Sequence, residues 1–79
     1  MNAALVDVPA IHVDARGLKC PWPALRLARA VRLAGGGVFE LMAEDPAAAR
    51  DIPRLANEHG WQIEALACKP PLLGWRIYA

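Results

Sequence analysis

Only two cysteines occur in this sequence, Cys20 and Cys68, and no C-x-x-C pair is present. They lie 48 positions apart, so their spacing supports neither a disulfide-stapled fold nor a thioredoxin-type dithiol centre. Histidine is equally scarce, with His12 and His59 far from each other along the chain. Zinc sites normally draw on closely spaced ligand pairs, and we therefore expect neither a metal nor another resident cofactor.

An excess of charge and a long apolar run are also missing. The formal net charge is +1, so no strong field would attract nucleic acid or a membrane surface. Charged residues interrupt every apolar stretch well before the ~20 residues that a membrane-spanning helix needs. Residues 1–10 do not show the basic and then apolar pattern of a secretory signal. We expect a cytoplasmic protein that binds no membrane and does not bind nucleic acid directly.

The chain of 79 residues shows no internal repeat, low-complexity run or linker. A chain of this length can bury one hydrophobic core and has no room for a second. We therefore predict a single domain over residues 1–79 with a flexible N-terminus at residues 1–9, and we expect a monomer.

Apolar and polar residues alternate in four short segments, which is the pattern of strands with one buried face. In the first of these segments, Ile11 and Val13 would face the core. The predicted strands cover residues 11–14, 38–44, 61–65 and 72–78.

Two other segments predict helices. Residues 21–34 contain no glycine, are rich in alanine and leucine, and end at three glycines where positive φ is easily adopted. Between residues 45 and 59, two prolines closely follow an aspartate, which is a signal for a helix start. We interpret these as capping residues of one interrupted helix that breaks near Asp51 and continues to His59. The four capping residues are Asp45, Pro46, Asp51 and Pro53.

The order of elements is βαβαββ. A strand, helix and strand in succession give a parallel pair through a right-handed crossover, and the last two strands form a hairpin. We therefore predict an α+β fold: a two-layer α/β sandwich whose four-stranded mixed sheet carries both helices on one face.

Cys20 is the candidate reactive residue. The residue before a proline favours extended geometry, and a proline suits the first helical position, so Cys20 is expected at a helix N-cap before Pro21. A helix N-terminus carries about half a positive charge, which favours a thiolate over a neutral thiol. Arg16 and Lys19, in the loop with Gly17, add positive charge. We predict an exposed thiolate with a lowered pKa.

Two prolines shape the same turn. Pro21 and Pro23 have no N–H, so Trp22 keeps the one free amide among the first three helical residues, and we expect this amide to point at the Cys20 sulfur. A thioredoxin-type motif would have its resolving cysteine at the position of Pro23. Sulfur loaded on Cys20 would therefore stay there until the cysteine of another protein removed it.

The run DARGLKCPWP at residues 14–23, followed by Asp45-Pro46 and Asp51-Ile52-Pro53, resembles the TusA-like (SirA-like) sulfur-carrier family. The resemblance spans nearly the whole chain, and it implies the same sandwich fold and a persulfide on the cysteine that matches Cys20. At Trp22 the sequence departs from the family, in which this position is often acidic or small.

The resemblance also implies partners and a mode of action. Such proteins take sulfur from a cysteine desulfurase or rhodanese-type donor and pass it to an acceptor protein with a reactive cysteine. The destinations are tRNA thiolation, molybdenum cofactor synthesis or sulfur oxidation. The chain would then be a sulfurtransferase-type carrier acting through its persulfide, and not a stand-alone catalyst with several catalytic residues.

Two other functions stay open on the residues alone. A compact sandwich could be a non-catalytic module that binds RNA or a regulator, although the balanced charge argues against it. A thiol redox enzyme would need Cys20 and Cys68 close together in space. Cys68 is otherwise a strand residue on the open face of the sheet, or a second sulfur-handling site. The helical arginines form either a solvated face or a docking site for an acidic partner; they are Arg26, Arg29 and Arg32.

Overall fold

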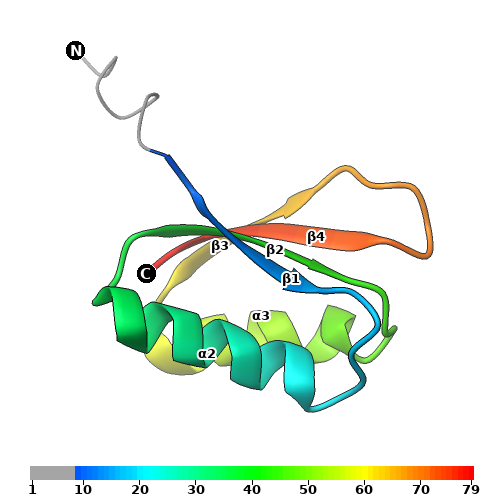
Figure 1. Cartoon of the computed structure of the whole chain (residues 1–79), viewed down its shortest axis with the longest axis horizontal. Coiled ribbons are helices and arrows are strands. Elements are labelled where there is room, and N and C mark those ends of the chain that lie inside the picture. The colour runs from blue at the N-terminus through cyan, green and yellow to red at the C-terminus, as the bar shows by residue number, and fades with distance from the viewer. Residues whose placement is uncertain (1–8) are drawn as a thin grey trace.

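Four strands form one mixed sheet, and two helices cover one of its faces (Figure 1). This computed structural model describes residues 9–79, so the flexible segment expected at residues 1–9 lies almost entirely outside the described residues. The elements, in chain order, are β1 (Ile11–Ala15), α2 (Trp22–Ala34), β2 (Val38–Ala43), α3 (Ala48–His59), β3 (Gln62–Leu66) and β4 (Leu73–Tyr78). The predicted order of elements and the two-layer α+β sandwich are confirmed.

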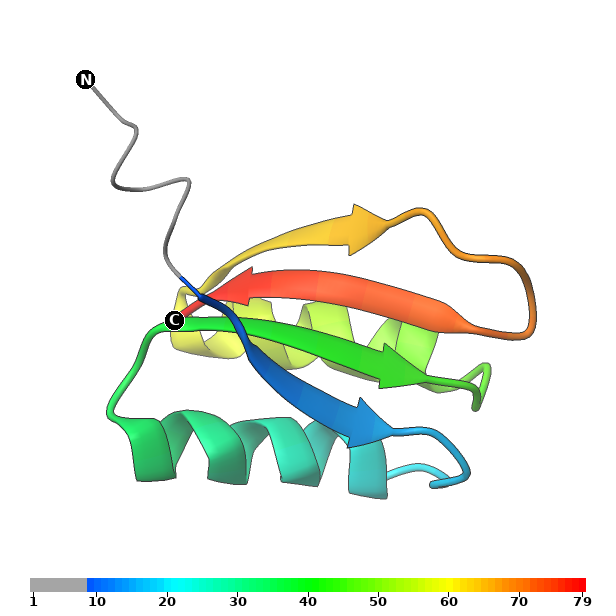
Figure 2. The same cartoon turned by 45° about the horizontal axis from the view of Figure 1, so that its top comes forward.

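The strands lie in the order β1-β2-β4-β3, as Figure 2 shows. β1 and β2 are parallel, whereas β4 runs antiparallel to both β2 and β3. Because β1 and β2 point the same way, both end at the same edge of the sheet, and the connections that follow them begin there. These two connections, at residues 16–21 and 44–47, build the candidate site.

The core lies between the sheet and the two helices. Five of its largest side chains are fully buried: Phe39, Leu27, Leu41, Ile52 and Ile77. The alternation expected along β2 is confirmed, because its odd-numbered residues are all buried while the even-numbered ones are half-buried. Ile11 pairs with the buried Phe39 and lies on the expected face of the sheet, but it is 44% exposed, because the start of edge strand β1 lies away from the helix layer (Figure 1).

Both helices end at a glycine, close to the positions predicted from the sequence. Gly35 and Gly60 each have φ 72°, a left-handed conformation that a glycine adopts without a Cβ clash. The amide of Gly35 donates to the carbonyl of Val31 at 2.9 Å, which satisfies one of the free carbonyls at the end of α2. Between residues 9 and 79, no helix has both the length and the apolar character needed to cross a bilayer.

The interruption expected in the second helix is wrong. α3 runs without a break from Ala48 to His59, and Pro53 lies inside it. Ala48, Ile52 and Ala56, spaced four residues apart, are buried on one side of the helix both before and after this proline. The apolar burial of these three residues stabilises the helix by more than it loses through the one backbone hydrogen bond that Pro53 cannot donate.

Candidate functional site

Cys20 lies exposed in the loop between β1 and α2. The predicted N-cap position is wrong by one residue, because α2 begins at Trp22 and Pro21 is its N-cap. The amide of Trp22 donates to the carbonyl of Lys19 at 2.8 Å, which closes a turn immediately before the helix. This amide therefore does not point at the Cys20 sulfur, as the sequence had suggested.

Asp45 joins the two connections at the edge of the sheet. Its Oδ2 accepts a hydrogen bond from the amide of Cys20 at 2.7 Å, and its Oδ1 accepts one from the amide of Ala47 at 3.2 Å. These amides hold the pKa of Asp45 below its usual range. Asp45 and Pro46 were expected to cap a helix, but the N-cap of α3 is Ala47, which makes no side-chain cap. Asp45 instead fixes the backbone of the cysteine.

Asp51 contacts the sulfur directly. Its Oδ2 lies 2.8 Å from Cys20 Sγ, and its Oδ1 accepts a hydrogen bond from Arg50 Nε at 2.9 Å. Its side chain is only 15% exposed. The expectation that Asp51 caps a helix is wrong, since it lies within α3 and uses both carboxylate oxygens to bind other side chains. Pro53, also expected at a helix start, lies two residues further along.

This contact reverses the predicted state of the thiol. The hydrogen bond to Asp51 is the main cause that raises the pKa of Cys20, and partial desolvation of the thiol and the Asp51 charge add to it. Arg50 opposes the effect more weakly. The same bond, together with the one from Arg50, lowers the pKa of Asp51. The contact with Asp51 therefore favours the neutral thiol of Cys20, with its S–H directed at the carboxylate, over the thiolate.

The charged loop residues act on other groups. Arg16 was expected to raise the positive potential at Cys20, but its guanidinium donates two hydrogen bonds to Asp14, at 2.9 and 3.0 Å, and lowers the pKa of Asp14 to about 2. Lys19 is exposed and contributes to lowering the pKa of Asp45. The amide of Gly17 donates to Glu44 Oε1 at 3.0 Å, which is a second link between the two connections.

Cys20 opens into a groove of about 320 Å³ between α2 and α3, which we call the Cys20 groove. Arg50 and Arg54 line it with positive charge, and Asp51 and Glu58 line it with negative charge. The other lining residues are Pro21, Ala24 and Leu55. Pro23 is buried beneath the first turn of α2 and fixes this turn against the core. Pro21 and Trp22 are exposed. The groove can admit a cysteine side chain from another protein.

Replacing Asp51 with asparagine is expected to make Cys20 react several-fold faster with iodoacetamide at neutral pH. The carboxylate raises the pKa of the thiol, so removing its charge lowers that pKa and increases the thiolate fraction at any pH below it. The measurement is the alkylation rate as a function of pH, whose midpoint should move to lower pH in Asp51→Asn. Asp14→Asn is the matched control, because Asp14 binds Arg16. An unchanged profile in Asp51→Asn would contradict the assigned contact.

Cys68 lies on the other side of the sheet. It is a half-buried free thiol after β3, and its sulfur sits with that of Met42 above Gly74. A Cβ at Gly74 would come within 3.0 Å of Cys68 Sγ and 2.9 Å of Met42 Sδ, so the missing side chain makes room for both. This agrees with the expected place of Cys68 on the open face.

The histidines take part in local contacts. His12 Nδ1 lies 3.8 Å from Glu40 Oε1, and the ring of His59 stacks on Trp61 with 4.7 Å between ring centroids. Within the part of the chain that the structure describes, no three His, Cys, Asp or Glu side chains are placed to hold a metal ion.

Comparison with known proteins adds a second line of evidence. The sequence model of the family described as sulfurtransferase TusA matches residues 11–77, a range that includes Cys20, Asp45 and Asp51. The sulfur carrier protein TusA of Pseudomonas putida is 43% identical over 56 residues, which cover 70% of each chain. That of Pseudomonas entomophila is 51% identical over 52 residues, which cover 65% of each chain. The crystal structure of a SirA-like protein from Desulfitobacterium hafniense matches with a TM-score of 0.79 and 28% identity, covering 87% of this chain and 96% of that one.

Proposed function

The chain belongs to the TusA sulfurtransferase family and is a sulfur carrier, and from this premise we propose that it holds the sulfur as a persulfide on Cys20. The observation that carries the proposal is the placement of this thiol: exposed, fixed through its amide, bound at Sγ by Asp51, and open to a groove. A carrier needs a thiol that other proteins can reach, and an exposed sulfur at the rim of a groove supports that role.

Loading is a thiol exchange. The Cys20 thiol loses its proton, and its sulfur attacks the terminal sulfur of a persulfide on a donor protein. A new S–S bond forms on Cys20, the S–S bond of the donor breaks, and the departing donor thiolate takes up the proton. No oxidant or reductant is consumed. Unloading is the same exchange, with a cysteine of the acceptor protein as the attacking group.

Asp51 would regulate both steps through charge. In the resting thiol, the S–H bond to Asp51 favours the protonated and less reactive form, which limits oxidation between transfers. A persulfide on Cys20 has no proton on Sγ, so this hydrogen bond is lost on loading. The terminal sulfur, about 2 Å further out, would then favour the arginines that line the groove, Arg50 and Arg54. The loaded sulfur would thus be oriented toward solvent and a partner.

The partners follow from this chemistry. We propose a donor of the cysteine desulfurase or rhodanese type, and an acceptor protein with a reactive cysteine, meeting the chain in the cytoplasm. The names of the relatives do not favour the alternative of a non-catalytic module that binds RNA or a regulator.

The test is to incubate the protein with glutathione persulfide, or with a cysteine desulfurase and cysteine, and to record its intact mass. One added sulfur atom is expected, which a reducing thiol removes and which peptide mapping assigns to the segment containing Cys20. If neither donor adds sulfur to a folded protein, the proposal is wrong.

A further inference from the structure

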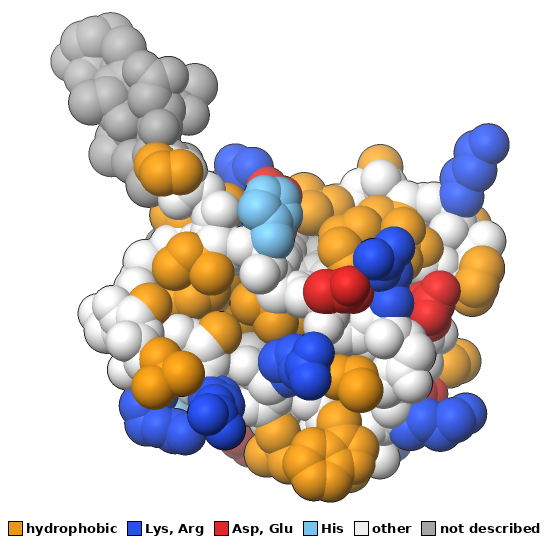
Figure 3. All heavy atoms as spheres, in the orientation of Figure 1, with side chains coloured by type: hydrophobic (Ala, Val, Ile, Leu, Met, Phe, Trp, Pro, Cys, Tyr) orange, Lys and Arg blue, Asp and Glu red, His pale blue; other side chains and the backbone are white. Residues whose placement is uncertain are grey.

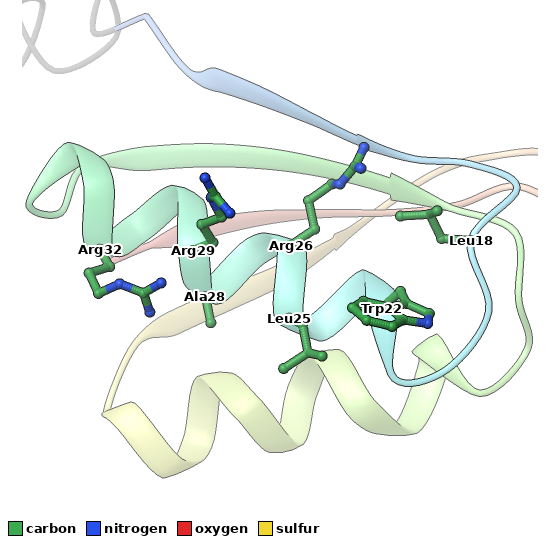
Figure 4. Close-up of a pocket in the computed structure, with 7 residues that line it drawn as sticks. All are labelled: Leu18, Trp22, Leu25, Arg26, Ala28, Arg29 and Arg32. Atoms are coloured by element: carbon green, nitrogen blue, oxygen red, sulfur yellow. The ribbon is translucent and has the colours of Figure 1, made fainter.

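One face of α2 is apolar and basic at the same time. Large side chains project from successive turns of this helix, and Leu18 from the preceding loop lies beside the first of them (Figure 4). They border a hollow of about 420 Å³. We call this the α2 surface; its residues are Leu18, Trp22, Leu25, Arg26, Ala28, Arg29 and Arg32.

Leu18 packs against the core, but the larger apolar side chains of this surface are not used by the fold. Between residues 9 and 79 the structure leaves five large hydrophobic residues exposed, and three of them lie on α2. Trp22 is 60% exposed, Leu25 50%, and the neighbouring Leu33 73%. Exposed apolar side chains gathered on one helix are typical of a surface that meets another protein.

The charge on this surface is all positive and largely unpaired. No acidic residue lines the hollow, and no carboxylate among residues 9–79 forms an ion pair with Arg29 or Arg32. Arg26 donates to the backbone carbonyl of Asp14 at 3.0 Å. Figure 3 shows blue and orange side chains side by side over α2, on the face toward the viewer. The complement of such a surface is a segment that offers carboxylates around an apolar side chain.

We propose that the α2 surface docks an acidic amphipathic segment of the protein that exchanges sulfur with Cys20. An apolar side chain of that segment sits against Trp22 and Leu25, and its carboxylates pair with Arg29 and Arg32. This inference rests on the proposed carrier function, because it assigns a partner to the same site. Trp22 is two residues from Cys20, so a segment bound here brings its protein to the mouth of the Cys20 groove.

A protein partner fits these side chains better than a nucleic acid does. Of the exposed apolar side chains here only Trp22 offers a stacking face to a base, because Leu25 and Leu33 are branched aliphatic side chains. The net charge of the chain is only +1, so its positive charge on α2 is local. A local basic cluster of this kind favours an acidic patch on a protein partner. A tryptophan flanked by arginines is the composition of an energetically dominant centre in a protein interface.

The test uses the full chain and three fluorescent probes. One is a short helical peptide with leucines along one side and glutamates elsewhere, the second has the same composition in scrambled order, and the third is a single-stranded RNA. We expect saturable binding of the amphipathic peptide by anisotropy, weaker at high salt. Trp22→Ala should weaken it about tenfold, and the double substitution Arg29→Glu with Arg32→Glu at least as much. Lys69→Glu, a single charge reversal of the same kind at an exposed residue beyond β3, should leave it unchanged.

The outcomes separate this inference from the carrier function. Absence of saturable binding, equal binding of the scrambled peptide, or unchanged binding in both α2 variants would overturn the docking proposal. Tighter binding of the RNA, lost in the double arginine variant, would overturn it in favour of nucleic acid. Loading of the wild-type protein by glutathione persulfide, a donor too small to need docking, is measured in parallel and tests the carrier function alone.

Discussion

Replacing Cys20 with serine is expected to abolish sulfur loading completely. A serine oxygen cannot form a persulfide, and no other thiol lies in the Cys20 groove. The substitution should leave the fold intact, because the side chain is exposed and a hydroxyl can still donate to Asp51. The measurement is intact mass after treatment with glutathione persulfide and, separately, with a cysteine desulfurase and cysteine.

Cys68→Ser is the matched control for this result. Cys68 is half-buried on the opposite face of the sheet, where its sulfur lies against Gly74 and Met42, and its loss should leave loading on Cys20 unchanged. Sulfur uptake in Cys20→Ser equal to that of the wild-type protein would assign the carrier role to another thiol. Loss of uptake in the Cys68 variant would show that both cysteines take part.

Phe39→Ala is expected to remove a large part of the stability of the fold. Phe39 lies on β2, between β1 and β4, and is fully buried. Truncating a buried phenylalanine costs about 3–5 kcal/mol, because apolar burial is lost and a cavity is left. At about 0.05–0.15 kcal/mol per residue, a domain of this size has only about 4–12 kcal/mol to lose. Urea unfolding followed by circular dichroism measures the change.

Leu33→Ala is the control, because Leu33 is also a large apolar residue but is 73% exposed. Its loss removes little buried surface, so the free energy of unfolding should change by less than about 0.5 kcal/mol. If the free energy of unfolding of Phe39→Ala were less than about 1 kcal/mol below that of the wild-type protein, the core would have closed around the missing ring, and the predicted cost of the cavity would be wrong.

Much of the fold could be predicted because its signals are local. The alternation along residues 38–44 identified the buried face of β2, and Gly35 and Gly60 marked both helix ends. Pro53 misled the prediction for the opposite reason. The local preference of a proline to end a helix was outweighed by burial of Ile52 and Ala56, which depends on the sheet beneath them.

The site could be located from the sequence, but its electrostatics could not. The motif around Cys20 identified the residue and its exposure, since a loop between charged residues and prolines seldom buries its thiol. The sign of the pKa shift depends on Asp51, which is 31 positions away and meets the sulfur only through the tertiary fold. One signal in the sequence could have suggested this contact: β1 and β2 were predicted to be parallel, and parallel strands bring the segments that follow them to the same edge of the sheet.

The pairing of β1 with β2 also makes the chemistry of the sulfur conditional on folding. Asp45 and Asp51 reach Cys20 only because these two strands run in the same direction and end together. A newly synthesised or partly unfolded chain therefore exposes an ordinary cysteine, without its guarding carboxylate. Only in the folded chain does the Asp51 carboxylate raise the pKa of Cys20, so the resting thiol is less easily ionised there than it is before folding is complete.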